Sequence, residues 1–117
     1  MPYLAILERL LAAVPGSLGA LLLDQAGELV VLAGLADMRH KLIGAYQGIA
    51  LATARRTAAR YPTGALTELV CRYEDGTLIL RPLVDDYYLV LSLSPEASVA
   101  RGLRFARDAQ AALDAEL

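Results

Sequence analysis

The sequence of 117 residues has one cysteine, one histidine and little net charge, and each scarcity excludes a class of protein. A single cysteine, Cys71, cannot form a disulfide within the chain, which fits a reducing compartment. One histidine and one cysteine provide no metal-site spacing, so we expect no metal ion. A formal net charge of −2 gives no attraction to nucleic acid or to an anionic membrane, so neither is expected as a partner.

Long apolar runs and targeting patterns are also missing. No stretch reaches the roughly 18 uninterrupted apolar residues of a membrane-spanning helix. The first residues have no basic region and include Glu8 and Arg9, which makes them a poor signal peptide. We therefore expect a cytoplasmic protein with no membrane insertion.

The usual motifs of nucleotide-binding and catalytic sites do not occur. The sequence contains neither GxxxxGK[ST] nor GxGxxG. His40 lies between Arg39 and Lys41, where a surface residue is a better interpretation than a metal ligand or a general base. Asp85 and Asp86 are better interpreted as a polar turn than as paired catalytic carboxylates. We expect no catalytic residue, cofactor or small-molecule substrate; an enzyme would need a deep pocket with convergent titratable groups.

Apolar residues, by contrast, are abundant. They make up 56% of the chain, above the roughly 45–50% that is ordinary for globular domains. The length fits a single domain over residues 1–117. Part of the apolar surface is therefore expected to serve an interface.

Hydrophobic periodicity and turn signals predict the element order α-β-β-α-β-β-β-α. The predicted helices and strands are a helix at 3–13, strands at 18–24 and 28–33, a helix at 38–60, strands at 65–74, 77–84 and 87–93, and a helix at 95–115. Asp37 and Ser94 are the expected N-caps, with Pro95 as the first residue of the last helix. Asp75-Gly76 is a type I′ hairpin signal.

The predicted strands hardly alternate between apolar and polar residues, so both faces of an antiparallel sheet should be covered. The fold class is α+β: a five-stranded antiparallel sheet with the terminal helices on one face and the long central helix on the other. One helix about 10 Å wide cannot cover five strands spaced about 4.8 Å apart. The row Gly44, Gly48 and Ala52 would let the central helices of two copies approach closely.

Three segments and the long small-residue helix between them, in this order, resemble the Roadblock/LC7 family. The segments are GALLLDQAGELVVLAG (19–34), RYEDGTLILRPL (72–83) and YYLVLSLSPEASVARGLRFARDA (87–109). The resemblance extends from Leu4 to about Leu113 and implies a profilin-like layout. It also implies a homodimeric or heterodimeric scaffold without catalytic residues, of which bacterial examples are partners of gliding and polarity GTPases.

The resemblance further implies that two copies pair their long helices and join their third strands. Together with the small-residue row, the expected dimer interface is Leu42, Gly44, Tyr46, Gly48, Ile49, Ala52, Thr53, Leu66, Leu69, Cys71 and Tyr73. Arg55, Arg56 and Arg60 could contact an acidic partner, although a solvated helix end is the better interpretation.

The leading hypothesis is a non-catalytic homodimeric scaffold that binds a small Ras-like GTPase and modulates its nucleotide cycle or localisation. The alternative is an adaptor or sensory interaction module, in a motor or signalling assembly that has no GTPase partner. The expectation that the chain binds a second copy of itself is separable from the choice between these hypotheses.

Overall fold

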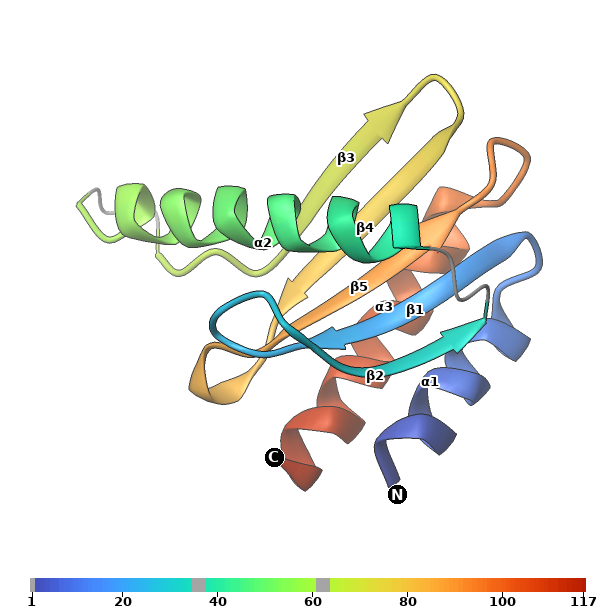
Figure 1. The fold of residues 1–117 in the computed structure, drawn as a ribbon, viewed down its shortest axis with the longest axis horizontal. Helices are drawn as coiled ribbons and strands as arrows, with labels where there is room; N and C mark the ends of the chain where they lie inside the picture. Colours follow the sequence, from blue (N-terminus) through green and yellow to red (C-terminus); the bar gives the residue numbers. More distant parts are fainter. Residues whose placement is uncertain (1, 35–37, 61–63) are drawn as a thin grey trace.

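Five strands form one antiparallel sheet with helices packed on both of its faces (Figure 1). The computed structural model describes residues 2–34, 38–60 and 64–117. The elements are α1 Pro2–Ala13, β1 Ser17–Leu23, β2 Leu29–Gly34, α2 Met38–Ala58, β3 Leu69–Tyr73, β4 Gly76–Pro82, a short 3₁₀ turn Val84–Asp86, β5 Tyr88–Leu93 and α3 Val99–Glu116. The predicted order is confirmed, and Asp37, the expected cap of α2, lies outside the described residues.

The strands are arranged in the order β2-β1-β5-β4-β3, and every neighbouring pair is antiparallel. The central strand β5 pairs with β1 on one side and with β4 on the other. The edges of the sheet are β2 and β3, so β3 has one ladder partner, β4, among the described residues. This position of β3 leaves the backbone of its outer side available for pairing.

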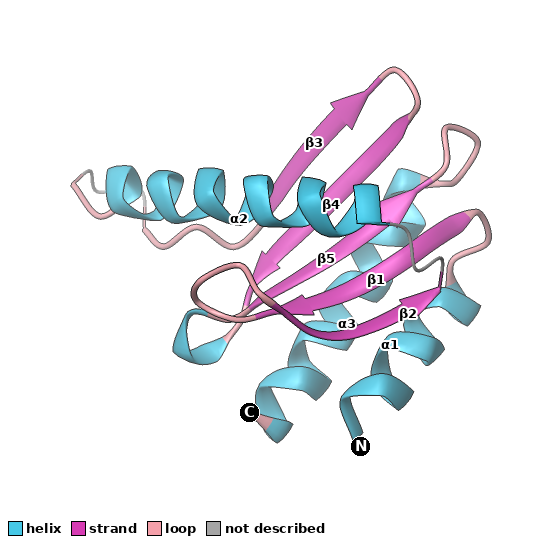
Figure 2. Ribbon diagram, in the orientation of Figure 1, coloured by secondary structure: helices cyan, strands magenta, loops and turns pink. Residues whose placement is uncertain are grey.

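The two faces of the sheet carry different helices (Figure 2). Helices α1 and α3 lie side by side on one face, where their side chains join those of the sheet in the larger apolar core. Helix α2 crosses the other face and shares a smaller apolar core with it, in which Leu51 is fully buried. The predicted α+β arrangement, with the terminal helices on one face and α2 on the other, is confirmed.

The unbroken apolar strands are explained by burial on both faces. All six positions of β5 are buried, and their side chains alternate between the two cores. Leu89 and Leu91 face α1 and α3, whereas Tyr88 and Val90 face α2. A strand between two apolar layers needs apolar residues at every position, because neither face meets water.

Helix α3 begins later than the sequence predicts. Its N-cap is Ser98, whose Oγ accepts a hydrogen bond of 3.1 Å from the backbone N–H of Arg101. Ser94 lies before the helix, and its N–H donates to the carbonyl of Gly16, 2.9 Å away, at the end of the sheet. The carbonyl of Ser94 then accepts from Ala97, so residues 94–97 form a turn before the helix.

The hairpin between β3 and β4 also differs from the prediction. Its loop residues are Glu74 and Asp75, between the paired residues Tyr73 and Gly76, and neither loop residue has the positive φ that a type I′ turn requires. Strand β3 is shorter than predicted, because Pro82 on the neighbouring strand has no N–H to extend the ladder beyond Leu69.

The turn between β4 and β5 lies where the sequence predicts a polar turn. Asp85 and Asp86 have φ values of 57° and 62°, and the N–H of Tyr87 donates to the carbonyl of Val84 at 3.3 Å. Three neighbouring elements hold this turn. Arg55 bonds to Asp86, Gln25 donates to the carbonyl of Asp85, and the carboxylate of Asp114 accepts from the N–H of Val84.

Candidate protein interaction site

The outward face of α2 carries large apolar side chains that no described residue covers. Leu42 is 56% exposed, Tyr46 71% and Ile49 65%. These residues are separated by four and three positions, so they form one stripe along the helix, which the exposed Thr53 extends. We call Leu42, Tyr46, Ile49 and Thr53 the α2 stripe. A continuous apolar surface of this kind is typical of an interface.

The inward face of α2 carries the small residues. A Cβ added to Gly44 would lie 3.3 Å from Leu21 Cδ1 and 3.4 Å from Leu23 Cδ1, and one added to Gly48 would lie 3.8 Å from the ring of Tyr88. Both glycines are buried against the sheet of their own chain. In the described structure these glycines let α2 approach its own sheet, and their place in a contact between two copies stays a prediction.

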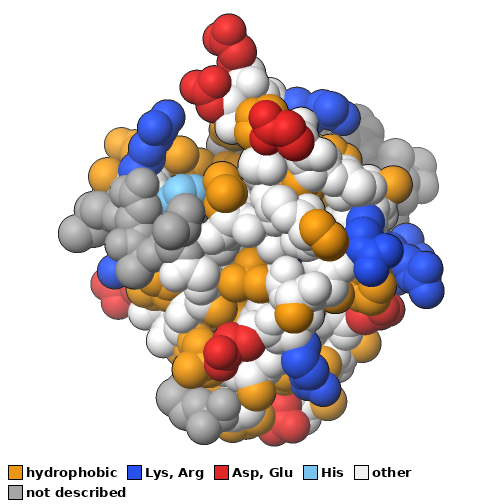
Figure 3. Space-filling view, turned by 90° about the vertical axis from the view of Figure 1, so that its right-hand side faces the viewer, with side chains coloured by type: hydrophobic (Ala, Val, Ile, Leu, Met, Phe, Trp, Pro, Cys, Tyr) orange, Lys and Arg blue, Asp and Glu red, His pale blue; other side chains and the backbone are white. Residues whose placement is uncertain are grey.

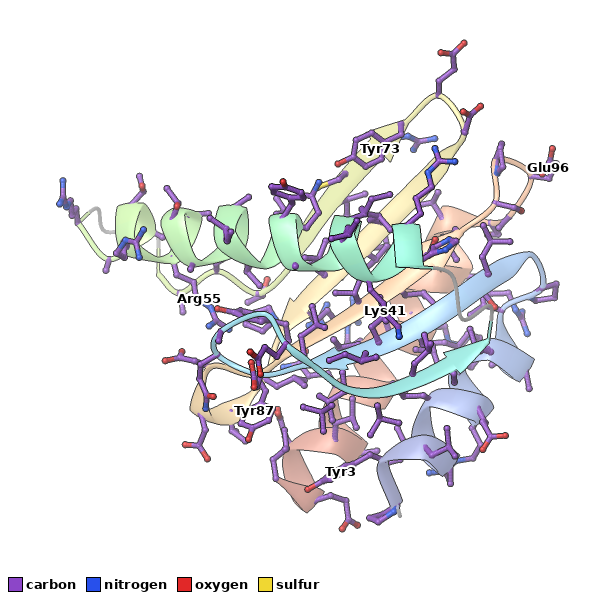
Figure 4. The ribbon with its side chains drawn as sticks, viewed as in Figure 1. Tyr3, Lys41, Arg55, Tyr73, Tyr87 and Glu96 are labelled. Atoms are coloured by element: carbon purple, nitrogen blue, oxygen red, sulfur yellow. The ribbon has the colours of Figure 1, made fainter. Side chains whose placement is uncertain are left out.

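Strand β3 lies beside α2 and is bonded to it through side chains. The thiol of Cys71 donates to Gln47 Oε1 at 3.1 Å, and the amide of the same Gln47 donates to the hydroxyl of Tyr73. Tyr73 is 52% exposed and stands above α2 (Figure 4), while Leu66, Leu69 and Cys71 are half-buried against the smaller core. The structure thus brings the unpaired edge of β3 next to the α2 stripe.

Cys71 is held as a neutral thiol. Burial raises the pKa of the Cys71 thiol above its ordinary value, because desolvation disfavours the thiolate. Since the thiolate is the nucleophilic form, this cysteine is poorly suited to covalent chemistry at neutral pH. Its role in the described structure is packing between β3 and α2.

The three arginines at the end of α2 do not form one cluster of free cations. Arg55 turns toward the sheet, where its Nη1 lies 3.0 Å from Asp86 Oδ1 and its guanidinium lies 5.0 Å from the ring centre of Tyr88. Arg56 and Arg60 are exposed, and Arg56 Nη2 donates to Thr53 Oγ1 at 3.3 Å. Arg55 therefore serves the fold, and only Arg56 and Arg60 of this set are presented to solvent.

Arg81 was not expected from the sequence to have a special role. It is 8% exposed, and it donates to Gln110 on α3 and to Glu68 in the segment before β3. Nothing in LILRPLV distinguishes this arginine from an edge-strand cation, since both of its partners are distant in sequence. Arg81 lines a cavity of about 690 Å³ between the end of α2 and α3, together with Arg55 and Asp114.

The described residues offer neither a metal site nor a membrane-spanning helix. In residues 2–34, 38–60 and 64–117, no group of three or more His, Cys, Asp or Glu side chains could hold a metal ion. Among the described helices, none combines the length and the apolar character needed to cross a membrane. The feature best developed for contact with another molecule is the α2 stripe with the edge of β3.

No protein-family model matches the sequence, and no curated protein matches it. Solved structures do resemble it in fold. A Roadblock/LC7 domain from Streptomyces avermitilis has a TM-score of 0.78 at 19% identity, with 92% of each chain covered. The gliding protein MglB from Thermus thermophilus has a TM-score of 0.85 at 19% identity, covering 97% of this chain and 86% of that one. MglC from Myxococcus xanthus has a TM-score of 0.70 at 24% identity over the whole of both chains.

Proposed function

We propose that this chain, whose fold is that of Roadblock/LC7 proteins, belongs to that family and forms a homodimeric, non-catalytic scaffold for a small Ras-like GTPase. The observation that carries the proposal is the exposed apolar α2 stripe beside the unpaired edge of β3.

The two faces of the sheet are covered unevenly. Two helices pack on one face and a single helix on the other, while the α2 stripe and Tyr73 stay exposed on that second face. A second copy, related by a two-fold axis, would cover the stripe with its own α2 and continue the sheet from β3. One symmetric contact would thereby satisfy both exposed features.

The proposal of a GTPase as partner rests on the fold shared with MglB, on the family resemblance of the sequence, and on the surfaces that a dimer would leave exposed. The fold is shared with MglB, described as a gliding protein, and the sequence resembles a family with GTPase partners. Pairing of α2 would leave other surfaces, including the exposed Arg60 just beyond the end of α2, open to a third molecule. We propose that the scaffold acts by binding, and that any change in GTP hydrolysis arises within the GTPase.

The dimer is tested by Ile49→Asp, with Leu4→Asp as the matched control. Leu4 is 40% exposed on α1, on the opposite face of the sheet. A charge at position 49 would be buried in the proposed contact, so we expect Kd for self-association to rise at least about a hundredfold. Sedimentation velocity would measure it. A wild-type monomer at all concentrations, or equal effects of the two variants, would contradict the dimer.

The partner is tested with a Ras-like GTPase encoded in the neighbouring genes of the same genome. Isothermal titration calorimetry would measure binding with GDP and with a non-hydrolysable GTP analogue, and phosphate release would report hydrolysis. We expect binding in one nucleotide state to be stronger than in the other. Lack of binding in both states, without any effect on hydrolysis, would instead support the adaptor alternative.

A further inference from the structure

The charges of α2 have one sign. Residues Met38–Ala58 include Arg39, Lys41, Arg55 and Arg56 and no aspartate or glutamate. Asp86 neutralises Arg55 from the β4–β5 turn. If two copies of α2 met with nothing acidic nearby, cations at both ends of the pair would repel one another. Because α2 has no acidic residue of its own, a carboxylate that pairs with the exposed Arg56 in such a contact would come from another element.

Exposed carboxylates of the β3–β4 turn lie near the amino-terminal half of α2. Glu74 and Asp75 line a cavity of about 570 Å³ together with Arg39, Tyr46 and Gln47 of α2. Both acidic residues are exposed. In Figure 3, acidic side chains gather at the top of the molecule, where Figure 1 places this turn. The amino-terminal half of α2 is thus bordered by an acidic turn.

The other half of α2 presents a cation on the same side as the stripe. Arg56 is exposed, and its Nη2 donates to Thr53 Oγ1, the last member of the α2 stripe. This bond places the guanidinium beside the surface that the proposed dimer covers. The α2 stripe therefore has a positive charge, Arg56, next to its carboxyl-terminal end.

Two-fold pairing would bring these opposite charges together. In an isologous contact, residue i of one copy meets residue j of the other and the reverse also holds. The α2 stripe has spacings of four, three and four residues, so it matches itself when one helix is reversed. Reversal places the Arg56 half of one helix against the other helix's amino-terminal half, which the Glu74–Asp75 turn borders.

We infer that Arg56 of each copy pairs with Glu74 and Asp75 of a second copy, which forms two identical ion-pair sites at the ends of the α2 contact. This inference rests on the proposed dimer. It adds that the charge pattern makes the contact selective for a second copy of the same chain. The apolar stripe supplies most of the affinity, while the charge pattern favours a second copy of this chain over a related chain without the acidic turn. Because the pairs are exposed, added salt weakens them.

Charge reversal tests the inference. Arg56→Glu and the double variant Glu74→Arg/Asp75→Arg should each raise the dimer Kd about tenfold at low salt, because two sites are lost in each homodimer. Each mixed dimer of the two variants holds two favourable sites, one with the wild-type charges and one with the charges exchanged, and no like-charge clash remains. We expect the mixed dimer to have a Kd within about threefold of wild type, measured by sedimentation velocity or by fluorescence anisotropy of a labelled chain.

The control is Arg107→Glu, which reverses an exposed arginine on α3, on the opposite face. The inference is overturned if Arg56→Glu weakens the dimer no more than this control does, or if mixing restores nothing. Failure of the dimer itself gives a different result: the wild-type chain would then stay monomeric and Ile49→Asp would change nothing. Recovery on mixing also shows that both variants fold.

Discussion

Single residues decide how closely α2 approaches the sheet. Gly44 and Gly48 lie one helical turn apart on the inward face, yet they face different neighbours. A Cβ added at Gly44 would meet the Leu21 methyl group at less than an ordinary contact distance, whereas one added at Gly48 would meet the Tyr88 ring at an ordinary van der Waals distance. Equivalent glycines in the sequence are therefore not equivalent in the structure.

Substitution at these glycines should have opposite effects. Gly48→Ala adds a methyl group that fits against Tyr88 and improves helix propensity, so we expect up to about 1 kcal/mol of stabilisation. Gly44→Leu forces α2 away from Leu21 and Leu23, at a cost of about 1–3 kcal/mol. Urea unfolding at a fixed protein concentration measures both. Stabilisation by Gly44→Leu would show that α2 is not seated as described.

The thiol of Cys71 provides a pH-dependent prediction. Burial raises its pKa above 9.0, so at pH 8 the folded chain holds less thiolate than the unfolded chain. We expect a thiol reagent to react more slowly with native protein than with protein in urea. The contribution of the neutral thiol to stability is present below pH 9.0 and is lost as pH rises through the raised pKa. Equal reaction rates would contradict this burial.

At the scale of elements, α3 is capped by Ser98 and not by Ser94, which the sequence pattern predicts as the N-cap. The N–H of Ser94 is engaged with Gly16 of the neighbouring loop, and this bond holds the chain to the sheet before the turn at Ala97. The helix begins after this turn, and its cap is Ser98. Helix α3 still packs fully on the sheet, since Ala106, Ala109 and Leu113 are buried.

The two serines provide a paired test. Ser98→Ala removes the side-chain acceptor for the Arg101 N–H and should cost about 1 kcal/mol of unfolding free energy. Ser94→Ala keeps the backbone bond to Gly16, so its effect should be smaller by at least about half. Chemical denaturation of both variants, followed by circular dichroism, measures the difference. A larger loss for Ser94→Ala would place the helix start where the sequence pattern alone predicts it.

At the scale of the whole molecule, the apolar cores on the two faces of the sheet differ in size. Among the described residues, the core beneath α1 and α3 contains more than twice as many buried residues as the core beneath α2. The thinner side is also the side with the exposed stripe. A second copy on that side would therefore stabilise the folded chain as well as assemble it.

Stability should depend on protein concentration. If the dimer binds only folded chains, the urea midpoint rises with concentration by mass action. Raising the concentration a hundredfold adds up to about 2.7 kcal/mol per mole of dimer, and Ile49→Asp should abolish the dependence. Fluorescence or circular dichroism at several concentrations provides the measurement. A midpoint that does not move for the wild type would argue that folding and assembly are independent.

Local rules predicted some features correctly, although they failed at the Ser94 cap and at the β3–β4 hairpin. The β4–β5 turn follows from Asp85 and Asp86, and burial of β5 on both faces follows from its unbroken apolar run. Contacts between distant residues could not be predicted, such as Arg55 with Asp86. The Gly44 and Gly48 pair shows the intermediate case: small residues signal a close approach, but the pattern cannot distinguish the chain's own sheet from a second copy.

The arrangement of α1 and α3 has a practical consequence for engineering the chain. The helices run antiparallel, and the hydroxyl of Tyr3 donates to the carbonyl of Glu116 at 3.0 Å. A short glycine-serine linker, which spans about 5–6 Å times the square root of its length, could join the two ends into a ring. The closed backbone would leave α2 and β3 untouched. Circularisation would thus raise thermal stability by restricting the unfolded chain, while self-association could still be measured.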